Sequence, residues 1–143
     1  MKTVRDILHK KGSSVWTIQP NATVRDALNE MATNDVGALV VIEREGVIGV
    51  ISERDYARKV IRKGKSSLDT LVEDIMAHEP TCVALDHTIR ECMAKMTDKH
   101  VRHLPVLEGT KLVGVISIGD VVAAIIGEHE SKIDELENMI YGS

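Results

Sequence analysis

Apolar residues recur along this chain at two spacings, one typical of helices and the other of short strands. The spacing i, i+3, i+4, i+7 places side chains on one face of a helix and occurs twice: at Val24, Ala27, Leu28, Met31, and at Ile89, Cys92, Met93, Met96. Each run follows a threonine with an acidic residue three positions later, Thr23 with Asp26 and Thr88 with Glu91. This is the arrangement of a capping box, so the pattern predicts two amphipathic helices.

Short β-branched runs follow each predicted helix. Residues 38–42 and 47–52 flank Arg44-Glu45-Gly46, and residues 104–107 and 112–117 flank Glu108-Gly109-Thr110. Runs of this length around turn residues predict two hairpins. Further helical runs begin near Asp55 and Asp120, so each half is predicted as helix, strand, strand, helix.

The chain is an internal repeat. At an offset of 65 residues, Gly49-Val50-Ile51-Ser52-x-x-Asp55 falls on Gly114-Val115-Ile116-Ser117-x-x-Asp120. The 34 positions from 22 to 55 contain 12 identities with their counterparts and no gap. Upstream, residues 4–8 resemble residues 72–76 at an offset of 68, so the first half holds three extra residues. These fall near the polar stretch His9–Ser14, which predicts a loop.

Size and composition bound the architecture. Two halves of about 65 residues are small for independent cores, so the economical arrangement is one unit that shares a buried face. Residues 69–76 join the halves, and Ile75-Met76 is expected to pack back on the sheet. From Val121 to Ile140 an amphipathic stripe, interrupted by Gly127 and ended at Gly142, favours packing on its own domain or on a second copy of the chain.

Charge and residue usage exclude several classes of function. The net charge is −4 and only Trp16, Tyr56 and Tyr141 are aromatic, which argues against a nucleic-acid partner. No stretch is long and apolar enough to span a membrane, and the start of the chain lacks a signal-peptide pattern, so we expect a soluble, cytoplasmic protein. Cys82 and Cys92 are expected to be buried thiols. His100 and His103 have no third ligand nearby in the sequence, so no metal site is predicted.

The repeated Ser-x-x-Asp motifs carry the chemistry. Ser52 and Ser117 each follow a predicted strand and open a helix, so one interpretation is an N-cap with an acidic first turn. A strand-to-helix turn also presents free backbone N–H groups to an anion, and a carboxylate there can accept both hydroxyls of a ribose. The motif thus favours nucleotide binding at two equivalent edges.

With these residues on hand, the chain resembles the cystathionine-β-synthase (CBS) domain family, whose signature ends in glycine, a hydrophobic residue, any residue, Ser or Thr, two further residues and Asp. The resemblance covers nearly the whole chain. It implies an α+β fold of two β-α-β-β-α repeats related by a pseudo-twofold axis, with a C-terminal helix. We expect one repeat with the N-terminal helix over 1–70, the second over 71–127, and a helical tail over 128–143.

The resemblance also implies the ligand site. Asp55 and Asp120 would hold ribose hydroxyls, and Ser52 and Ser117 a ribose or phosphate oxygen. The adenine would lie against Thr17, Gly37 and Ala38 in one cleft, and against Val83, His103 and Leu104-Pro105 in the other. Because Gly37-Ala38 aligns with Arg102-His103, the two clefts are not equivalent.

Phosphate groups would need cations near these clefts. The candidates are Arg54, Arg102, His103 and, through the extra residues of the first half, Lys10 or Lys11. The basic run Arg58, Lys59, Arg62, Lys63, Lys65 is interpreted mainly as a solvated face at a helix C-terminus, and a polyphosphate contact is the alternative.

The leading hypothesis is a regulatory module without catalytic activity, a homodimer that binds AMP, ADP, ATP or NAD(H) and signals to a separate protein. No catalytic cofactor is expected. A nucleotide-processing enzyme is one alternative, although the chain lacks a P-loop, an H-E-x-x-H motif and a G-x-S-x-G elbow. A dimerisation scaffold without a ligand is the other.

Overall fold

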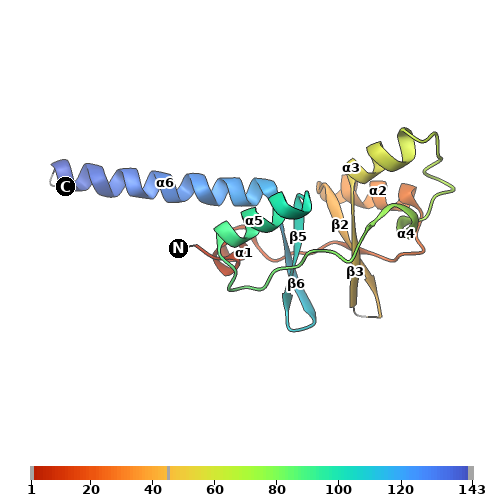
Figure 1. Cartoon of the computed structure of the whole chain (residues 1–143), viewed down its shortest axis with the longest axis horizontal. Helices are drawn as coiled ribbons and strands as arrows, with labels where there is room; N and C mark the ends of the chain where they lie inside the picture. Colours follow the sequence, from red (N-terminus) through yellow and green to blue (C-terminus); the bar gives the residue numbers. More distant parts are fainter. Residues whose placement is uncertain (1, 45, 142–143) are drawn as a thin grey trace.

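The computed structural model describes residues 2–44 and 46–141. Two halves lie side by side, each with an antiparallel hairpin, and a long C-terminal helix leaves the second half and projects beyond the body (Figure 1). The α+β fold and the C-terminal helix predicted from the sequence are confirmed.

The first half contains six regular elements and one π-helical turn. They are α1 (Val4–Lys11), β1 (Thr17–Ile18), α2 (Val24–Asn34), β2 (Ala38–Glu43), β3 (Gly46–Ser52), α3 (Glu53–Tyr56) and the π-helical turn η1 (Ala57–Ile61). The second half contains α4 (Val72–Ile75), β4 (Ala77–His78), α5 (Ile89–Lys99), β5 (His103–Glu108), β6 (Lys111–Ser117) and α6 (Ile118–Tyr141).

The same bonds recur in both halves at the offset of 65. The hairpins β2–β3 and β5–β6 share their register, with a shift after Val41 and after Val106. A short parallel pairing flanks each hairpin, β1 on β2 in the first half and Val83 on Val106 in the second. Both capping boxes form as predicted, because Asp26 and Glu91 donate their backbone N–H groups to the hydroxyls of Thr23 and Thr88.

Each core is completed by a segment from the other half. Val4, Ile7 and Leu8 of α1 pack in the core beneath β5 and β6, whereas Val72 and Ile75 of α4 pack in the core beneath β2 and β3. The expected return of Ile75-Met76 onto the first sheet is therefore confirmed.

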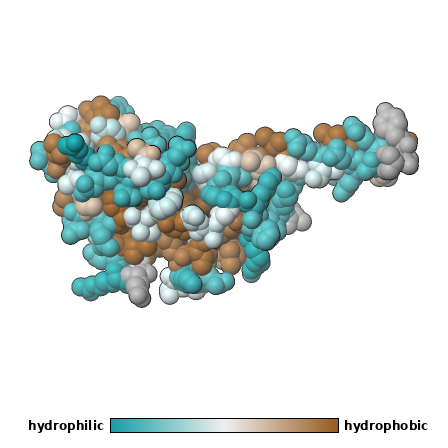
Figure 2. All heavy atoms as spheres, turned by 180° about the vertical axis from the view of Figure 1, so that it is seen from behind, coloured by the Kyte–Doolittle hydropathy of each residue, from teal (hydrophilic) through white to brown (hydrophobic). Residues whose placement is uncertain are grey.

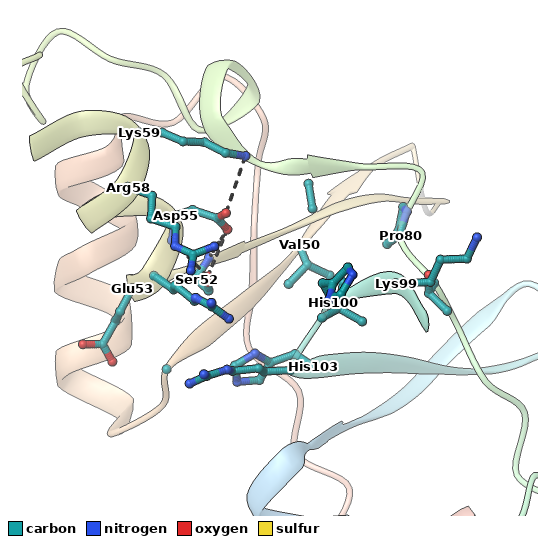
Figure 3. A pocket seen from close by; sticks show the side chains of 16 residues that line it. Val50, Ser52, Glu53, Asp55, Arg58, Lys59, Pro80, Lys99, His100 and His103 are labelled. Carbon is teal, nitrogen blue, oxygen red and sulfur yellow. Dashed lines mark hydrogen bonds and ion pairs between the residues drawn. The ribbon is translucent and has the colours of Figure 1, made fainter. Parts of the chain in front are cut away.

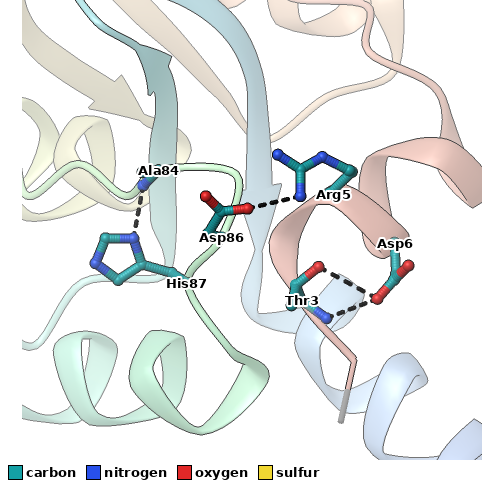
Figure 4. Close-up of polar contacts among 6 residues, drawn as sticks. All are labelled: Thr3, Arg5, Asp6, Ala84, Asp86 and His87. Carbon is teal, nitrogen blue, oxygen red and sulfur yellow. Dashed lines mark hydrogen bonds and ion pairs between the residues drawn. The ribbon is translucent and has the colours of Figure 1, made fainter.

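Polar contacts fix α1 on the second half. The Arg5 guanidinium donates to the Asp86 carboxylate at 2.6 Å, and the backbone N–H groups of Val4 and Arg5 donate to the carbonyls of His87 and Leu85 (Figure 4). The N-terminal helix thus belongs to the first half in sequence but packs on the second.

Two glycines permit these crossed contacts. A Cβ atom at Gly49 would lie 2.6 Å from Met76 Sδ, and one at Gly114 would lie 2.7 Å from a methyl group of Leu8. The glycine that opens each repeated motif is therefore required where a segment of the other half crosses the strand.

The loop predicted over His9–Ser14 is wrong in its first part. His9, Lys10 and Lys11 form the last turn of α1, where basic side chains suit the negative end of the helix dipole, and only Gly12–Ser14 lie outside regular structure. The C-terminal helix is continuous from Ile118 to Tyr141, with Gly127 inside it. Glu45 of the predicted turn and the predicted stop at Gly142 lie outside the described residues.

Candidate functional site

Two clefts lie where the halves meet. The larger has a volume of about 610 Å³ and the smaller about 410 Å³. Gly37 and His103 line both of them. The clefts are therefore adjacent, with one residue of each half between them.

The Ser52-x-x-Asp55 motif forms one wall of the larger cleft. Oδ2 of Asp55 accepts hydrogen bonds from the Ser52 backbone N–H at 2.9 Å and from the Ser52 hydroxyl at 3.0 Å. Oδ1 of Asp55 lies 3.5 Å from Nζ of Lys59. The capping box thus holds the carboxylate in a fixed place at the cleft wall, with Oδ1 still able to accept hydrogen bonds.

Positive charge surrounds this carboxylate. Figure 3 shows Ser52, Asp55, Arg58 and Lys59 on one side of the cleft, with Lys99, His100 and His103 across from them. Five cationic side chains line the cleft against the two carboxylates of Glu53 and Asp55: Arg54, Arg58, Lys59, Lys99 and Arg102. Desolvation, together with the neighbouring guanidinium groups of Arg58 and Arg102, lowers the pKa of Arg54. The cleft is therefore suited to an anion.

Apolar groups line another part of the same cleft. Val50, Ala77, Pro80 and Val101 contribute to its lining. A cleft with apolar walls and a few convergent polar groups is a common form of small-molecule site.

The smaller cleft has a different lining. Trp16, Gly37 and Ala38 come from the first half, and Val115 and Ser117 come from the second. Lys11 also lines it, and its ammonium group donates to the Asp120 carboxylate at 2.7 Å and to the Val115 carbonyl at 2.8 Å. The counterpart of Asp55 is thus already paired with a lysine of the chain itself.

The electrostatics of Asp120 reflect this pairing. Burial acts to raise the pKa of Asp120, but the hydrogen bonds from Lys11 and from the Ser117 backbone outweigh burial and lower it. Asp120 is therefore ionised at neutral pH and has an internal counter-ion.

His103 lies between the two clefts. Burial lowers its pKa, and the nearby charges of Asp120, Lys11, Asp55 and Arg102 act more weakly and in opposite directions. The imidazole is therefore neutral at pH 7, with one nitrogen able to donate and the other able to accept.

The structure brings only part of the predicted site to the clefts. Ser52, Arg54, Asp55, Arg102, Gly37 and His103 line the larger cleft, and Ala38, Ser117 and Lys11 line the smaller. Neither cleft is lined by Thr17, Val83, Leu104, Pro105, Asp120 or Lys10. Val83, Leu104 and Pro105 are buried in the second sheet and its core, and Lys10 is exposed on α1.

The larger cleft is also lined by Lys99 and His100, for which no ligand contact was expected, and by Arg58 and Lys59, for which a polyphosphate contact was only the alternative interpretation. Arg58 and Lys59 lie one helical turn after Asp55, and this i+4 spacing could have indicated that Lys59 faces the carboxylate. Lys99 and His100 end α5, where His100 adopts a left-handed backbone conformation with φ 54°. No local pattern in the sequence indicates that this helix end faces the other half.

Metal and membrane sites find no support in the described part of the chain. Residues 2–44 and 46–141 contain no group of three or more His, Cys, Asp or Glu side chains placed to hold a metal ion. None of the helices within these ranges has the length and apolar character needed to cross a membrane. Of the two predicted buried thiols, Cys92 is buried and Cys82 is half-buried; both are free.

Two known CBS-domain proteins are similar to this chain over most of its length. A CBS-domain protein from Arabidopsis thaliana, CBSX3, named as mitochondrial, is 38% identical over 98% of this chain and 72% of its own length. A structure of a candidate signal-transduction protein with CBS domains from Burkholderia ambifaria is 44% identical, covering 88% of this chain and 95% of the other, with a TM-score of 0.85.

A third similarity concerns a structure with bound ligands. The CBS domain pair of protein MJ0100, in complex with 5′-methylthioadenosine and S-adenosyl-L-methionine, shares the fold at a TM-score of 0.78 and 19% identity, over 90% of this chain and 98% of the other. The family model of the CBS domain matches residues 3–62 and 72–127, and each match contains one copy of the repeated glycine-to-aspartate motif. The chain belongs to the CBS domain family, as a pair of CBS repeats.

Proposed function

We propose that this CBS pair is a regulatory module without catalytic activity that binds a phosphorylated adenosine ligand, such as AMP, ADP, ATP or NAD(H), in the larger cleft. One observation carries the proposal: a carboxylate fixed by its capping box lies in the same cleft as five cationic side chains. The carboxylate can accept hydrogen bonds from ribose hydroxyls, and the cationic side chains can bind phosphates.

The two oxygens of Asp55 have different roles in this proposal. Oδ2 is occupied by the N–H and hydroxyl of Ser52, which close the first turn of α3. Oδ1 faces only Lys59, at 3.5 Å, among the contacts of the described chain. A ribose hydroxyl can donate to Oδ1 without opening the cap, so binding does not cost the helix its N-terminal hydrogen bonds.

The cations would take the phosphates. Arg54, Arg58 and Arg102 lie close enough that their charges lower the pKa of Arg54 after desolvation, and planar guanidinium groups bind phosphate through two hydrogen bonds. An anion at this place relieves the repulsion among them. The base would lie against the apolar lining formed by Val50, Ala77, Pro80 and Val101.

The choice among adenosine ligands follows from the charge. The related pair of MJ0100 is described with 5′-methylthioadenosine and S-adenosyl-L-methionine, neither of which carries a phosphate. In this chain the excess of cations over carboxylates in the larger cleft favours a phosphorylated ligand. In the smaller cleft we expect weaker binding, because Asp120 does not line it and is already paired with Lys11.

An enzymatic role has less support. Ser52 is the hydroxyl that a nucleotide hydrolase could use, but its oxygen accepts the Asp55 backbone N–H at 3.2 Å and its proton is directed to the capping carboxylate. A hydroxyl with both of these hydrogen bonds caps a helix and is not activated as a nucleophile.

We further propose that the module is a homodimer in the cytoplasm that signals to a separate effector. Because one relative is named as mitochondrial, the location of this protein should be tested directly.

The test is ligand binding by purified full-length protein, measured by calorimetry and thermal shift with AMP, ADP, ATP, NAD, NADH and S-adenosyl-L-methionine. At about 100 times its dissociation constant, a specific ligand should add roughly 2.7 kcal/mol to the free energy of unfolding. Arg58→Gln should weaken binding of a phosphorylated ligand by about 10- to 100-fold, since a charge-assisted hydrogen bond contributes about 1.5–3 kcal/mol.

Asp55→Asn provides the second arm, and Asp26→Asn is its matched control. Both substitutions alter the third helical residue of a capping box, but Asp26 lies in α2, away from the clefts. Equal losses of stability with loss of binding only in Asp55→Asn would support the ribose contact. Binding of no ligand in the panel would contradict the proposal and favour the scaffold, and turnover of a bound nucleotide would favour the enzyme.

A further inference from the structure

The outer part of α6 projects from the body with its apolar side chains exposed. Val121, Ala124 and Ile125 pack in or against the second core, and Glu128 accepts the backbone N–H of Lys2 at 3.0 Å. Beyond this point residues 130–140 are all exposed, and the helix extends away from the body (Figure 1). Isolated helices of this length are marginal in water, because most helical stability in proteins comes from packing of an apolar face.

The exposed apolar side chains follow a heptad. The positions Val122, Ile126, His129, Ile133, Leu136 and Ile140 are separated by four, three, four, three and four residues, the spacing of a coiled-coil seam. All six are exposed, with Ile133 54% and Leu136 49% accessible. Figure 2 shows apolar patches along the projecting helix from behind. A helix that packed only on its own domain would not leave this stripe in solvent.

The residue types along the seam favour two parallel strands. Each a position is isoleucine, at 126, 133 and 140, and the d position between the last two is Leu136. β-Branched residues at a with leucine at d favour parallel dimers over higher oligomers. His129 occupies a d position, and a single polar residue in a seam fixes register at a cost in stability.

The charges beside the seam agree with this orientation. In a parallel pair the g residue of one helix lies near the following e residue of its partner, which places Lys132 beside Glu137 of the second copy. In an antiparallel pair the e positions face one another, which would bring Glu130 near Glu137. The pattern is therefore complementary to itself only in the parallel arrangement.

We propose that the outer part of α6 pairs with the same helix of a second copy of this chain in a parallel, in-register, two-stranded coiled coil. This inference rests on the homodimer proposed above and names its contact. It places the two CBS pairs on the same side of a shared stalk. Ligand binding in the clefts and pairing of α6 can fail independently, because no residue of the seam lines either cleft.

The test is the mass of the full-length chain by sedimentation equilibrium. Wild type should be a dimer. Ile133→Asp and Leu136→Asp should each raise the dimer dissociation constant by at least about a hundredfold, because each buries two unpaired carboxylates in the seam. Ser131→Asp, on the outer face of the same helix, is the matched control and should leave the constant unchanged.

Two further arms test orientation. Lys132→Glu and Glu137→Lys should each weaken the dimer about tenfold through like-charge contacts, and the double substitution should restore it. Under mild oxidation Leu136→Cys should form a dimer-linking disulfide, whereas Glu135→Cys and wild type, with its own Cys82 and Cys92, should not.

The outcomes separate the inference from the homodimer itself. A wild-type monomer overturns both. A dimer that withstands Ile133→Asp and Leu136→Asp overturns the coiled coil and leaves a homodimer with another contact. A trimer or larger assembly overturns the two-stranded form, and charge substitutions that are not rescued in combination overturn the parallel arrangement.

Discussion

Single glycines decide how closely the two halves approach. A Cβ atom at Gly49 would lie 2.8 Å from the backbone carbonyl oxygen of Ala77, as well as 2.6 Å from Met76 Sδ. The side chain of Met76 can move, but the carbonyl belongs to β4, which pairs with β3 at this point. Gly49→Ala should therefore reduce the free energy of unfolding by about 1–3 kcal/mol.

Chemical denaturation of Gly49→Ala measures this loss. Gly46→Ala is the control, because its nearest neighbour is 3.5 Å away and the new methyl group makes an ordinary contact. If the two variants were equally stable, the close approach at Gly49 would not be the reason for the glycine.

Lys11 and Asp120 form the pair that distinguishes the smaller cleft. The folded pKa of Asp120 is below its usual 3.8, because the bonds from Lys11 and Ser117 outweigh the effect of burial. A carboxylate with a depressed pKa stabilises the fold above its unfolded pKa and loses that contribution as pH falls through the folded pKa. Lys11→Met should therefore cost about 0.5–1 kcal/mol at pH 7 and progressively less below about pH 4.

A carbon-detected NMR titration of Asp120 gives the direct measurement. In Lys11→Met the pKa of Asp120 should rise, because burial still raises it and the bond from Lys11 no longer lowers it. Lys10→Met, one residue earlier on the exposed side of α1, should leave it unchanged. An Asp120 pKa that is the same in wild type and Lys11→Met would show that the pair does not persist in solution.

Every predicted residue that lines a cleft belongs to the repeat, except Lys11. Ser52 and Asp55 follow from the motif, because a capping box is a local arrangement of four residues. Lys11 was named only as a phosphate contact, and its bond to Asp120 spans 109 positions. Lys99 and His100 reach the cleft through the packing of one half on the other. Such contacts depend on tertiary structure, so local spacing could not predict them.

At the scale of elements, α1 and β6 meet through one close contact. The methyl groups of Leu8 lie where a side chain on Gly114 would begin. Leu8→Ala should cost about 2–4 kcal/mol by leaving a cavity, and Gly114→Ala should cost less than Gly49→Ala, because only a flexible side chain must shift.

The double-mutant cycle gives the sharper result. In Leu8→Ala/Gly114→Ala the new methyl group fills part of the space that leucine leaves, so the double variant should be more stable than the sum of the two losses predicts, by about 0.5–2 kcal/mol. Strict additivity in urea denaturation would mean that α1 does not cross β6 as the structure has it.

Hairpins and amphipathic helices follow from local sequence patterns, whereas the end of α1 does not. β2 and β3 follow from short β-branched runs, and α2 and α5 from apolar spacing behind a capping threonine. The polar residues His9, Lys10 and Lys11 predict a loop, but they form the end of α1. Polar residues in the last turn are compatible with a helix whose buried face is carried by Val4, Ile7 and Leu8 alone.

At the scale of the whole molecule, the crossed segments join the two halves into one cooperative unit. If the second half unfolded alone, α1 would lose the core on which it packs. α4, which begins the second half in sequence, would stay packed on the first sheet. Each core therefore depends on residues whose chain continues into the other. We therefore expect the CBS pair, rather than the single repeat, to be the unit that folds.

Scanning calorimetry tests this dependence. The chain should unfold in one transition whose calorimetric and van't Hoff enthalpies agree, at roughly 0.7 kcal/mol per residue near 60 °C. Leu8→Ala in the second core and Val72→Ala in the first should each lower the temperature of that single transition at a fixed protein concentration. Two resolved transitions, with each variant moving only one, would show that the halves fold separately.

Because both clefts are built from residues of both halves, a cooperative unit would also mean that a ligand in the larger cleft stabilises the whole pair, including the base of α6.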